Sequence, residues 1–487
     1  MVSLAPPLHA RPAARERAWP RTAAPWLAGL LAYAVVAVAP QVLNDGDSWW
    51  HVTAGGWMLD HRRVLVADVF SYTFAGRPWH AHEWLAEALM AAVFRADGWS
   101  GVVLLYAAAA GSAAAILARQ LGRDLGGLAL ALVLLLALGC MAPSLLARPH
   151  LLALPLLAAW TAGLVQARDA GRAPPLPLAL VMAAWANLHG GYVLGLALIG
   201  PFALEALVEA PPALRVSTAR AWTAFAAASL AACLVTPFGL AGLIFPFKLL
   251  GLSSLAGVGE WRPADFSRPG PLEIALLGGL FVLLQRGVRV PPLRLALLLL
   301  LLHMSLQHSR HQMLLAVIGP MLLAGPLAEA LAAGKVRPAG GSAAGRGWAL
   351  ACAAAALVLA GARAALPIGR VDGPSAPISA LQHVPPDLRA QPVFNDYGMG
   401  GYLIFSGVRP FIDGRTDMYG DAFTNAYLRA ERPDLTAFDG ILARWRVRWT
   451  LLDAQDPLVQ AMDRKPGWRR LYADRFAVVH VREAAVP

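Results

Sequence analysis

Long runs of apolar residues, separated by short polar gaps, make up most of the chain as far as about residue 367. A bilayer core about 30 Å thick is spanned by a helix of ~20 apolar residues. The pattern therefore predicts a polytopic α-helical membrane protein with about eleven transmembrane helices. The runs lie at 25–43, 99–118, 125–143, 149–167, 174–189, 191–208, 221–236, 271–285, 291–307, 311–331 and 347–366.

Basic residues concentrate in alternate gaps between these runs, which gives the chain a predicted orientation. Cytoplasmic loops carry the excess of Lys and Arg, so the N-terminus is expected in the cytoplasm. An odd number of spans then places the C-terminal segment outside, on the same face as the long loop 44–98. The basic gaps hold Arg11 to Arg21, Arg119 and Arg123, Arg168 and Arg172, Arg215 and Arg220, Arg286 to Arg294, and Lys335 to Arg346.

The composition after about residue 367 is that of a soluble domain, with charges of both signs and short β-like runs. The expected domains are a cytoplasmic tail over 1–24, a transmembrane domain over 25–367 and a small extracytoplasmic α/β domain over 368–487. The Gly398-x-Gly400-Gly401 segment is interpreted as leading into a strand and not as a phosphate-binding loop. Strands are expected at 393–394, 401–405, 410–412, 449–452 and 476–481, and helices at 420–446 and 456–463.

The overall composition excludes two other classes of protein. Hydrophobic residues make up 57% of the chain and charged residues 15%, against about 25% charged residues in a soluble domain. A single soluble globule or a disordered chain is therefore excluded. The net charge is +11, but the arginines lie between the apolar runs, so no nucleic-acid partner is expected.

The first external loop, 44–98, is rich in tryptophan, which is typical of the membrane–water interface. Residues 47–60 and 82–94 are expected to form short amphipathic helices there. At the start of the loop, Asp45 and Asp47 are able to bind a divalent cation, or one of them to act as general base. His51 lies one helical turn after Asp47, so one helical face is expected to carry both side chains. The alternative is an ordinary Asp cap at a helix N-terminus.

Further polar residues are predicted on the same external face. His82 and Glu83 could supply metal ligands or substrate hydrogen bonds, or merely favour a helix N-terminus. Arginines at helix ends could bind a lipid phosphate or pyrophosphate, or only reach the headgroup layer. This group comprises Arg148, His150, Asn187, His189, Glu260, Arg262, Arg310 and His311.

Two charged residues of the C-terminal domain, Arg415 and Asp417, follow a predicted turn at Asp413-Gly414. They are candidates for binding a sugar or a phosphate. An internal salt bridge that fixes the turn is an equally good interpretation of the same residues.

Several of these segments together resemble the GT-C superfamily of membrane glycosyltransferases, in particular a bacterial group within it. The similar segments are D-x-D-S-W-W-H from Asp45, G-R-P-W-x-x-H-E-W-L from Gly76, A-R-P-H from Ala147, W-A-N-L-H-G-G from Trp185, E-W-R-P from Glu260 and F-I-D-G-R-T-D-M-Y-G from Phe411. The resemblance covers most of the chain. It implies a GT-C-like helical domain in a bacterial inner membrane.

The resemblance also implies an activity, in which a sugar passes from a polyprenyl-phosphate-linked donor to a glycan, lipid or protein acceptor on the external face. A loop Asp then acts as general base, with Asp47 as first choice and Asp45 as second. Some members need a divalent metal, so Mg²⁺ or Mn²⁺ is a candidate cofactor, with Asp45, Asp47 and His82 as candidate ligands. The candidate substrate-binding residues are His51, His82, Glu83, Arg148, His189, Glu260, Arg262, Arg310 and His311.

Two other functions fit a protein of this composition. A transporter or flippase of lipid-linked sugars would place polar groups at mid-membrane depth, often in paired repeats, whereas here they gather at one external face and no repeat is found. A non-catalytic subunit of a cell-envelope glycan assembly would use the Asp pair structurally. The enzyme is favoured over both.

Overall fold

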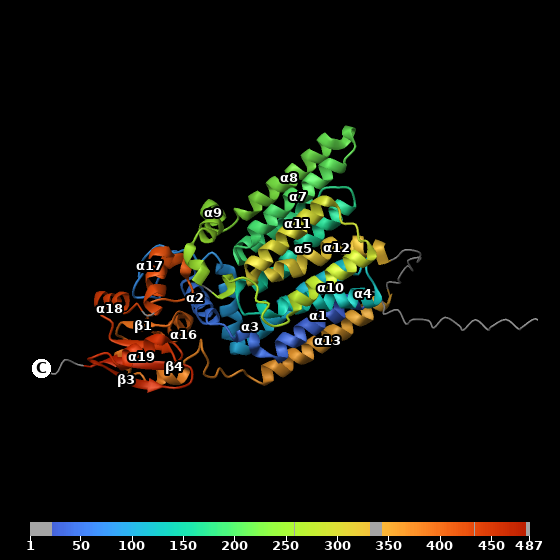
Figure 1. Ribbon diagram of the computed structural model, residues 1–487. Coiled ribbons are helices and arrows are strands. Elements are labelled where there is room, and N and C mark those ends of the chain that lie inside the picture. Colours follow the sequence, from blue (N-terminus) through green and yellow to red (C-terminus); the bar gives the residue numbers. More distant parts are fainter. Residues whose placement is uncertain (1–21, 258, 332–342, 433, 484–487) are drawn as a thin grey trace, which may run out of the picture.

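The computed structural model describes residues 22–257, 259–331, 343–432 and 434–483. A bundle of long helices makes up one part of the molecule, and a smaller α/β domain packs against one end of it (Figure 1). The expected cytoplasmic tail lies almost wholly outside the described residues. Lys335 and Arg337, expected in a cytoplasmic loop, also lie outside them.

All eleven apolar runs are helical over most of their length. Among the described residues, six helices are suited by length and composition to crossing a membrane: α3, α4, α5, α7, α12 and α13. The predicted number of about eleven crossings stays a prediction. The helices up to residue 365 are α1 (Ala24–Val38), α2 (Asp47–His61), α3 (Trp84–Leu121), α4 (Gly127–Met141), α5 (Pro149–Asp169), α6 (Leu180–Leu188), α7 (Tyr192–Glu209), α8 (Arg215–Cys233), α9 (Gly239–Leu250), α10 (Pro271–Arg286), α11 (Pro292–Gln307), α12 (Gln312–Leu331) and α13 (Ala343–Ala365).

Helix α3 joins the loop 44–98 to the bundle. Its first turns correspond to the amphipathic helix expected at 82–94, and its remainder to the apolar run at 99–118. The two parts meet at a kink, where Gly98 has a φ of 54°. A glycine adopts that conformation without the steric penalty of a Cβ atom, so the chain turns there without a separate loop.

A four-stranded sheet forms the centre of the C-terminal domain, with strand order β1-β2-β4-β3. Strand β1 pairs in parallel with β2, and the other pairs are antiparallel. The elements of this domain are α14 (Ile378–Gln382), α15 (Pro386–Arg389), β1 (Val393–Asn395), α16 (Gly400–Phe405), α17 (Thr416–Glu431), α18 (Leu435–Arg444), β2 (Trp449–Asp453), α19 (Pro457–Asp463), β3 (Trp468–Ala473) and β4 (Ala477–Arg482).

Two of the predicted strands in this domain are wrong. Residues 401–405 belong to helix α16, which follows β1 after a short turn, so the glycine segment does lie between a strand and a helix. Residues 410–412 are irregular because the Asn395 side chain takes their backbone hydrogen bonds, accepting from Phe411 N and donating to Ile412 O at 2.8 Å each. Strand β3 was not predicted, since each of its residues is partly or fully exposed.

The loop 44–98 and the C-terminal domain are tightly joined. The Tyr72 hydroxyl donates to the Val393 carbonyl at 2.8 Å, and the Thr73 hydroxyl to the Phe411 carbonyl at 2.8 Å. The Arg415 guanidinium, which has no solvent exposure, bonds both Asp68 of the loop and Asp413 of the domain at 2.7 Å. The loop and the domain therefore lie on the same side of the helical bundle.

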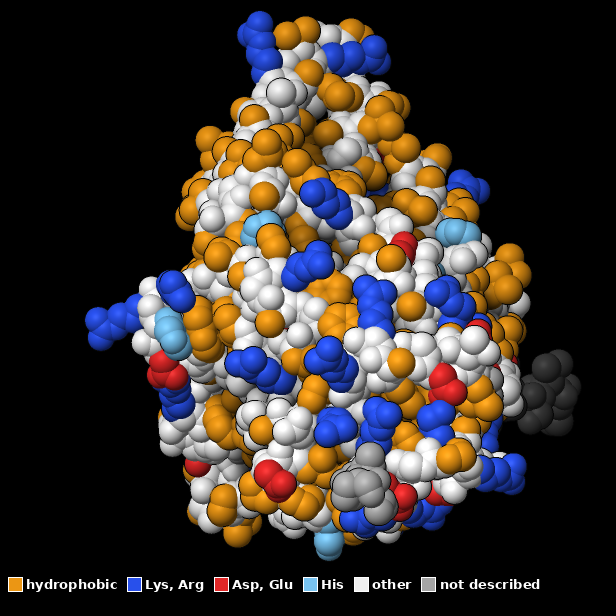
Figure 2. All heavy atoms as spheres, turned by 90° about the vertical axis from the view of Figure 1, so that its left-hand side faces the viewer, with side chains coloured by type: hydrophobic (Ala, Val, Ile, Leu, Met, Phe, Trp, Pro, Cys, Tyr) orange, Lys and Arg blue, Asp and Glu red, His pale blue; other side chains and the backbone are white. Residues whose placement is uncertain are grey.

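Figure 2 shows this side of the molecule. Lys and Arg side chains are spread over the lower part of the face, where the C-terminal domain lies. The upper part, formed by the projecting helices α7 and α8, is largely covered by apolar side chains. Exposed apolar side chains on these helices, such as Leu204, Val208 and Leu230, suit a lipid environment.

Candidate functional site

The two acidic residues after the first apolar run share one arginine. Arg148, at the start of α5, bonds Asp45 through Nε at 2.6 Å and Asp47 through Nη2 at 2.9 Å. A planar guanidinium suits such multiple carboxylate contacts. The sequence placed these three residues on one external face, and the structure brings them into direct contact.

The same arginine links the acids to a third carboxylate from a distant loop. Arg148 Nη1 lies 2.9 Å from Glu260 Oε2, and Glu260 Oε1 lies 3.0 Å from Arg310 Nη1. The Arg310 guanidinium also stacks over the Trp261 ring, 4.5 Å from its centroid. These five residues, Asp45, Asp47, Arg148, Glu260 and Arg310, are called the carboxylate–arginine cluster below.

The two aspartates of this cluster differ in their accessibility. The Asp45 side chain is only 4% exposed, and its Oδ1 accepts the Asp47 backbone N–H at 2.7 Å. Asp45 thus shapes the turn that precedes α2, but the N-cap residue of α2 is Gly46 and has no side-chain cap hydrogen bond, so neither aspartate is the N-cap that the alternative interpretation expects. The Asp47 side chain is 19% exposed, and its Oδ1 accepts the Trp50 indole N–H at 3.0 Å. Asp47 is therefore the carboxylate that a substrate can reach.

The electrostatic surroundings of Asp47 favour a basic carboxylate. The pKa of Asp47 is raised to about 6, mainly by burial and also by the neighbouring Asp45 and Glu260, against the lowering effect of Arg148 and of the Trp50 hydrogen bond. Burial also acts to raise the pKa of Glu260, but Arg148 and Arg310 outweigh it and hold that pKa below its usual range. The cluster thus contains one carboxylate whose pKa is lowered and one, Asp47, that gains a proton near pH 6.

Backbone of the C-terminal domain covers the acidic turn. A Cβ atom on Gly414 would lie 1.9 Å from Asp47 Oδ1, and one on Gly401 would lie 2.2 Å from the Gly46 carbonyl oxygen. Only glycine permits such an approach. Sequence reasoning treated Gly414 as part of a turn and missed its contact with Asp47, because the two lie far apart along the chain.

A second polar group lies beside this cluster. Glu83 Oε1 lies 3.6 Å from His82 Nε2 and 3.6 Å from His189 Nε2. Burial raises the pKa of Glu83 to about 8, with a further contribution from Asp417, and burial lowers the pKa of His82 to about 4. Near neutral pH this group is therefore largely uncharged, with a proton on Glu83 and neutral imidazoles.

Three of the predicted substrate-binding residues lie outside both groups. His51 is buried and its Nδ1 lies 3.2 Å from Glu87 Oε1. His51 follows Asp47 by one turn of α2, but helix α3, which carries Glu87, packs over it and separates it from the cluster. His311 Nδ1 lies 3.3 Å from the Met304 carbonyl oxygen. Arg262 is exposed, and within the described residues its side chain has no hydrogen bond or ion pair.

The remaining predicted residues at helix ends have structural contacts. Asn187 accepts the Trp84 indole N–H at 2.8 Å, and thereby joins α6 to α3. The His150 ring Nε2 lies 2.9 Å from the Ser144 carbonyl oxygen, at the start of α5. Both contacts fix the helix ends that carry Arg148 and His189.

Metal binding by Asp45, Asp47 and His82 stays a prediction. Within the described residues, no three His, Cys, Asp or Glu side chains are grouped so that they could hold a metal ion. Both aspartates are bound to Arg148, while His82 packs against Phe245 with ring centroids 4.2 Å apart. The two aspartates are thus placed to bind the Arg148 guanidinium and not a metal ion.

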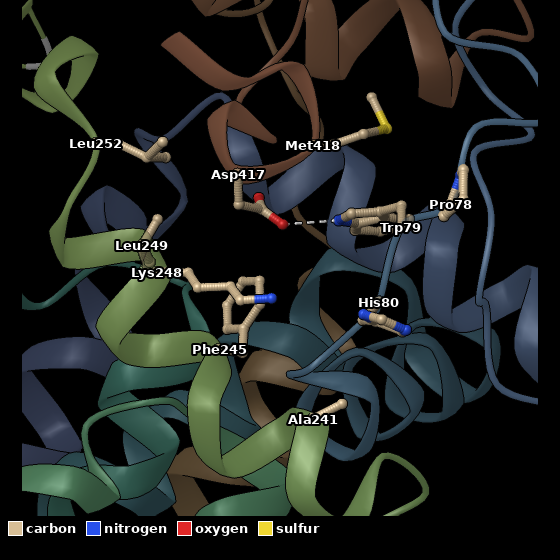
Figure 3. Close-up of a pocket in the computed structure, with 10 residues that line it drawn as sticks. All are labelled: Pro78, Trp79, His80, Ala241, Phe245, Lys248, Leu249, Leu252, Asp417 and Met418. Atoms are coloured by element: carbon tan, nitrogen blue, oxygen red, sulfur yellow. Dashed lines mark hydrogen bonds between the residues drawn. The ribbon is translucent and has the colours of Figure 1, made fainter.

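The two charged residues of the C-terminal domain differ in their roles. Arg415 forms the buried ion pairs with Asp68 and Asp413, in agreement with the structural interpretation. The Asp417 carboxylate accepts the Trp79 indole N–H at 3.0 Å and faces a pocket (Figure 3). Burial raises the pKa of Asp417 to about 6.

The architecture of this chain is similar to that of a solved structure. No family model and no curated protein matches the sequence. Among solved structures, the chain is similar to the crystal structure of ArnT from Cupriavidus metallidurans bound to undecaprenyl phosphate. The TM-score is 0.50 and the sequence identity 12%, over 94% of this chain and 98% of that chain.

At this level of identity the similarity concerns the fold. The fold class predicted from the sequence, a GT-C-like polytopic helical protein with a small C-terminal α/β domain, is confirmed. This fold is the one that the predicted resemblance to the GT-C superfamily implies, and the similarity extends no further than the fold. Together with its apolar helices, this fold makes the chain a multi-pass membrane protein.

Proposed function

We propose that this protein is a bacterial inner-membrane glycosyltransferase that transfers a sugar from a polyprenyl-phosphate-linked donor to an acceptor at the external face. The observation that carries the proposal is the carboxylate–arginine cluster, in which Arg148 joins Asp47 to Glu260 and Arg310. The cluster lies where the first external loop, the ends of bundle helices and the C-terminal domain meet. The ArnT-like fold supports the same class of activity.

In this proposal Asp47 is the general base. The acceptor hydroxyl transfers its proton to the Asp47 carboxylate while its oxygen attacks the anomeric carbon of the donor sugar. The bond from that carbon to the phosphate oxygen breaks, and the polyprenyl phosphate leaves with the electron pair. A single displacement of this kind inverts the anomeric centre. A base with a pKa near 6 is ionised at neutral pH yet accepts a proton readily.

The arginines stabilise the phosphate that is released. Arg148 is already bound to three carboxylates, through all three of its guanidinium nitrogens. Arg310 uses only Nη1, for Glu260, and within the described residues its other nitrogens have no hydrogen bond. Arg310 is thus the guanidinium with donors available for a phosphate, while Arg148 positions Asp47 and Glu260.

The test is transfer by the purified full chain in lipid nanodiscs. The substrate is undecaprenyl phosphate carrying a radiolabelled sugar, supplied as a panel of sugar types, with a glycolipid extract of the bacterial envelope as acceptor. We expect label to enter the extract with the wild-type protein and the rate to fall at least ~10²-fold in Asp47→Asn, the usual size of a general-base effect. Asp60→Asn, at the exposed end of the same helix, is the matched control and should keep the wild-type rate.

The alternative functions predict different results. A flippase would move the labelled lipid across the bilayer of a vesicle without breaking the sugar–phosphate bond. A non-catalytic subunit would leave the label on the undecaprenyl phosphate in every sample. Either result with folded wild-type protein, or an unchanged rate in Asp47→Asn, would contradict the proposal.

A further inference from the structure

A pocket with a volume of about 220 Å³ lies between the first external loop, α9 and the C-terminal domain. Its floor and walls come from all three parts, as Figure 3 shows. The volume is below the roughly 300–1,000 Å³ of sites for drug-sized ligands, so the pocket suits one small ring and not a whole lipid. The lining residues are Pro78, Trp79, His80, Ala241, Phe245, Lys248, Leu249, Leu252, Asp417 and Met418.

Two charged groups of opposite sign face this pocket with unused bonding capacity. The Asp417 carboxylate accepts the Trp79 indole N–H and a hydrogen bond from its own backbone, but it has no ion pair within the described residues and retains acceptor capacity for a ligand. Lys248 extends into the pocket in Figure 3, and its ammonium has no ion pair or hydrogen bond there either. A ligand with both acceptors and donors, such as a polyhydroxylated ring, would satisfy both groups.

Aromatic side chains make up much of the remaining wall. Trp79 and Phe245 both line the pocket. The C–H faces of a sugar ring are apolar and pack well on aromatic rings, while its hydroxyls bond to carboxylate and ammonium groups. Aromatic rings beside one carboxylate and one ammonium therefore fit a sugar better than a purely apolar or purely ionic ligand.

Helix α9 has one exposed apolar face and another face that lines the pocket. Leu240, Ile244 and Phe247 are exposed on one face, with 64%, 43% and 60% relative exposure. Phe245 and Lys248 lie on another face, toward the pocket. The helix has 12 residues and is too short to cross a bilayer. It is suited to lie at the lipid surface with the pocket beneath it.

The pocket adjoins the carboxylate–arginine cluster through aromatic contacts. The Trp79 ring lies 6.1 Å from the Trp50 ring, centroid to centroid, and the Trp50 indole donates to Asp47. On the other side, Phe245 packs against His82, which neighbours Glu83. The pocket wall is thus connected to the proposed base through the contact of Trp79 with Trp50.

From these contacts we propose that the pocket is a sugar-binding subsite, which holds a sugar ring of the donor or of the acceptor with Asp417, Lys248, Trp79 and Phe245. This inference rests on the proposed function for the identity of the two substrates. The binding itself requires no turnover, so it is testable separately.

Footprinting of the lysines is a direct test. The chain has three lysines, Lys248, Lys335 and Lys465, and Lys465 pairs with Asp439 on the C-terminal domain, away from the pocket. The full chain in nanodiscs is treated with an amine-acetylating reagent, and modification of each lysine is read by mass spectrometry. The probes are undecaprenyl phosphate alone, undecaprenyl phosphate carrying a sugar, and an envelope glycolipid extract.

We expect one of the two sugar-bearing probes to protect Lys248 from acetylation at least threefold, while undecaprenyl phosphate alone does not. Protection by the sugar-linked donor assigns the ring to the donor, and protection by the extract assigns it to the acceptor. Lys465 should be modified equally in every sample. Asp417→Asn, which keeps an oxygen for the Trp79 bond, should abolish the protection, and Asp439→Asn should preserve it.

The subsite is disproved if no sugar-bearing probe protects Lys248, or if undecaprenyl phosphate alone protects it equally well. Failure of the proposed function gives a different pattern. Protection of Lys248 that depends on the sugar, combined with no transfer of label by the wild-type protein, would uphold the pocket and contradict the glycosyltransferase.

Discussion

Gly414 of the C-terminal domain lies directly against Asp47 of the loop 44–98. A Cβ atom placed on Gly414 would be 1.9 Å from Asp47 Oδ1 and 3.0 Å from Trp50 Nε1. The glycine thus leaves just enough room for the carboxylate and for the indole N–H that holds it. The position of the proposed base is therefore set by two parts of the chain that are far apart in the sequence.

We predict that Gly414→Ala lowers the rate of sugar transfer, because the added methyl displaces the Asp47 carboxylate. A misplacement of about 1 Å at a reacting group can cost roughly 10²-fold in rate. The measurement is the initial rate in nanodiscs, together with the thermal unfolding temperature. Gly440→Ala is the control, since a Cβ there has open space around it. A wild-type rate in folded Gly414→Ala would show that Asp47 is not the base.

A second prediction concerns the buried ion pairs that join the loop to the domain. Arg415 bonds Asp68 and Asp413, and all three side chains are fully buried. Removing the arginine by Arg415→Met leaves two uncompensated buried carboxylates, which costs about 3–5 kcal/mol. We expect a lower unfolding temperature and faster proteolysis of residues 62–83.

The matched control for that variant is Arg470→Met, which removes an exposed pair with Asp463. Exposed pairs contribute about 0–1 kcal/mol, so its stability should stay close to that of the wild type. Equal unfolding temperatures for Arg415→Met and Arg470→Met would contradict the structural role assigned to Arg415.

The helical bundle could be predicted from the sequence because the bilayer imposes a simple rule. A lipid-facing segment has to satisfy its backbone hydrogen bonds internally, so each apolar run of sufficient length becomes a helix. The run at 149–167, for example, became α5 over Pro149–Asp169. Helix α9 was not predicted, since its 12 residues in an external loop are below the spanning length.

The candidate site was only partly predictable. The acids at 45 and 47 are recognisable, because two carboxylates next to an apolar run are costly unless they have a partner. The partners of these acids could not be predicted. Arg148 and Glu260 are 112 residues apart, and no local pattern indicates that they meet. The strand predicted at 401–405 is wrong for a related reason. Tyr402, Leu403 and Ile404 are all buried, so the hydrophobic pattern of this segment has no period that distinguishes a helix from a strand.

The pH dependence of transfer gives a third prediction. Burial raises the pKa of Asp47 to about 6, and a general base acts only in its ionised form. The rate should therefore be constant above about pH 7 and fall tenfold per pH unit well below pH 6. Because the Glu260 charge also raises the pKa of Asp47, Glu260→Gln should move this acid limb to lower pH.

The control for the pH experiment is Glu483→Gln, at the end of β4 and remote from the cluster. Its pH profile should coincide with that of the wild type. An acid limb in Glu260→Gln that stays in place or moves to higher pH would show that another group controls the rate.

The last prediction concerns the guanidinium proposed to bind the donor phosphate. Arg310 is held by one bond to Glu260 and by stacking on Trp261, so its unused nitrogens are directed by two contacts. A hydrogen bond to a charged group contributes roughly 1.5–3 kcal/mol, which corresponds to about 10- to 150-fold in affinity. Arg310→Met should weaken binding of undecaprenyl phosphate to nanodisc protein by a factor in this range.

Arg262→Met is the matched control for this variant, because Arg262 belongs to the same external region but is exposed and outside the cluster. Non-specific attraction of an anionic lipid to a basic surface would weaken equally in both variants and would decrease strongly with added salt. A specific phosphate site requires a much larger loss for Arg310→Met than for Arg262→Met at 0.15 M ionic strength, where the Debye length is about 8 Å. Equal losses would remove Arg310 from the proposed donor site.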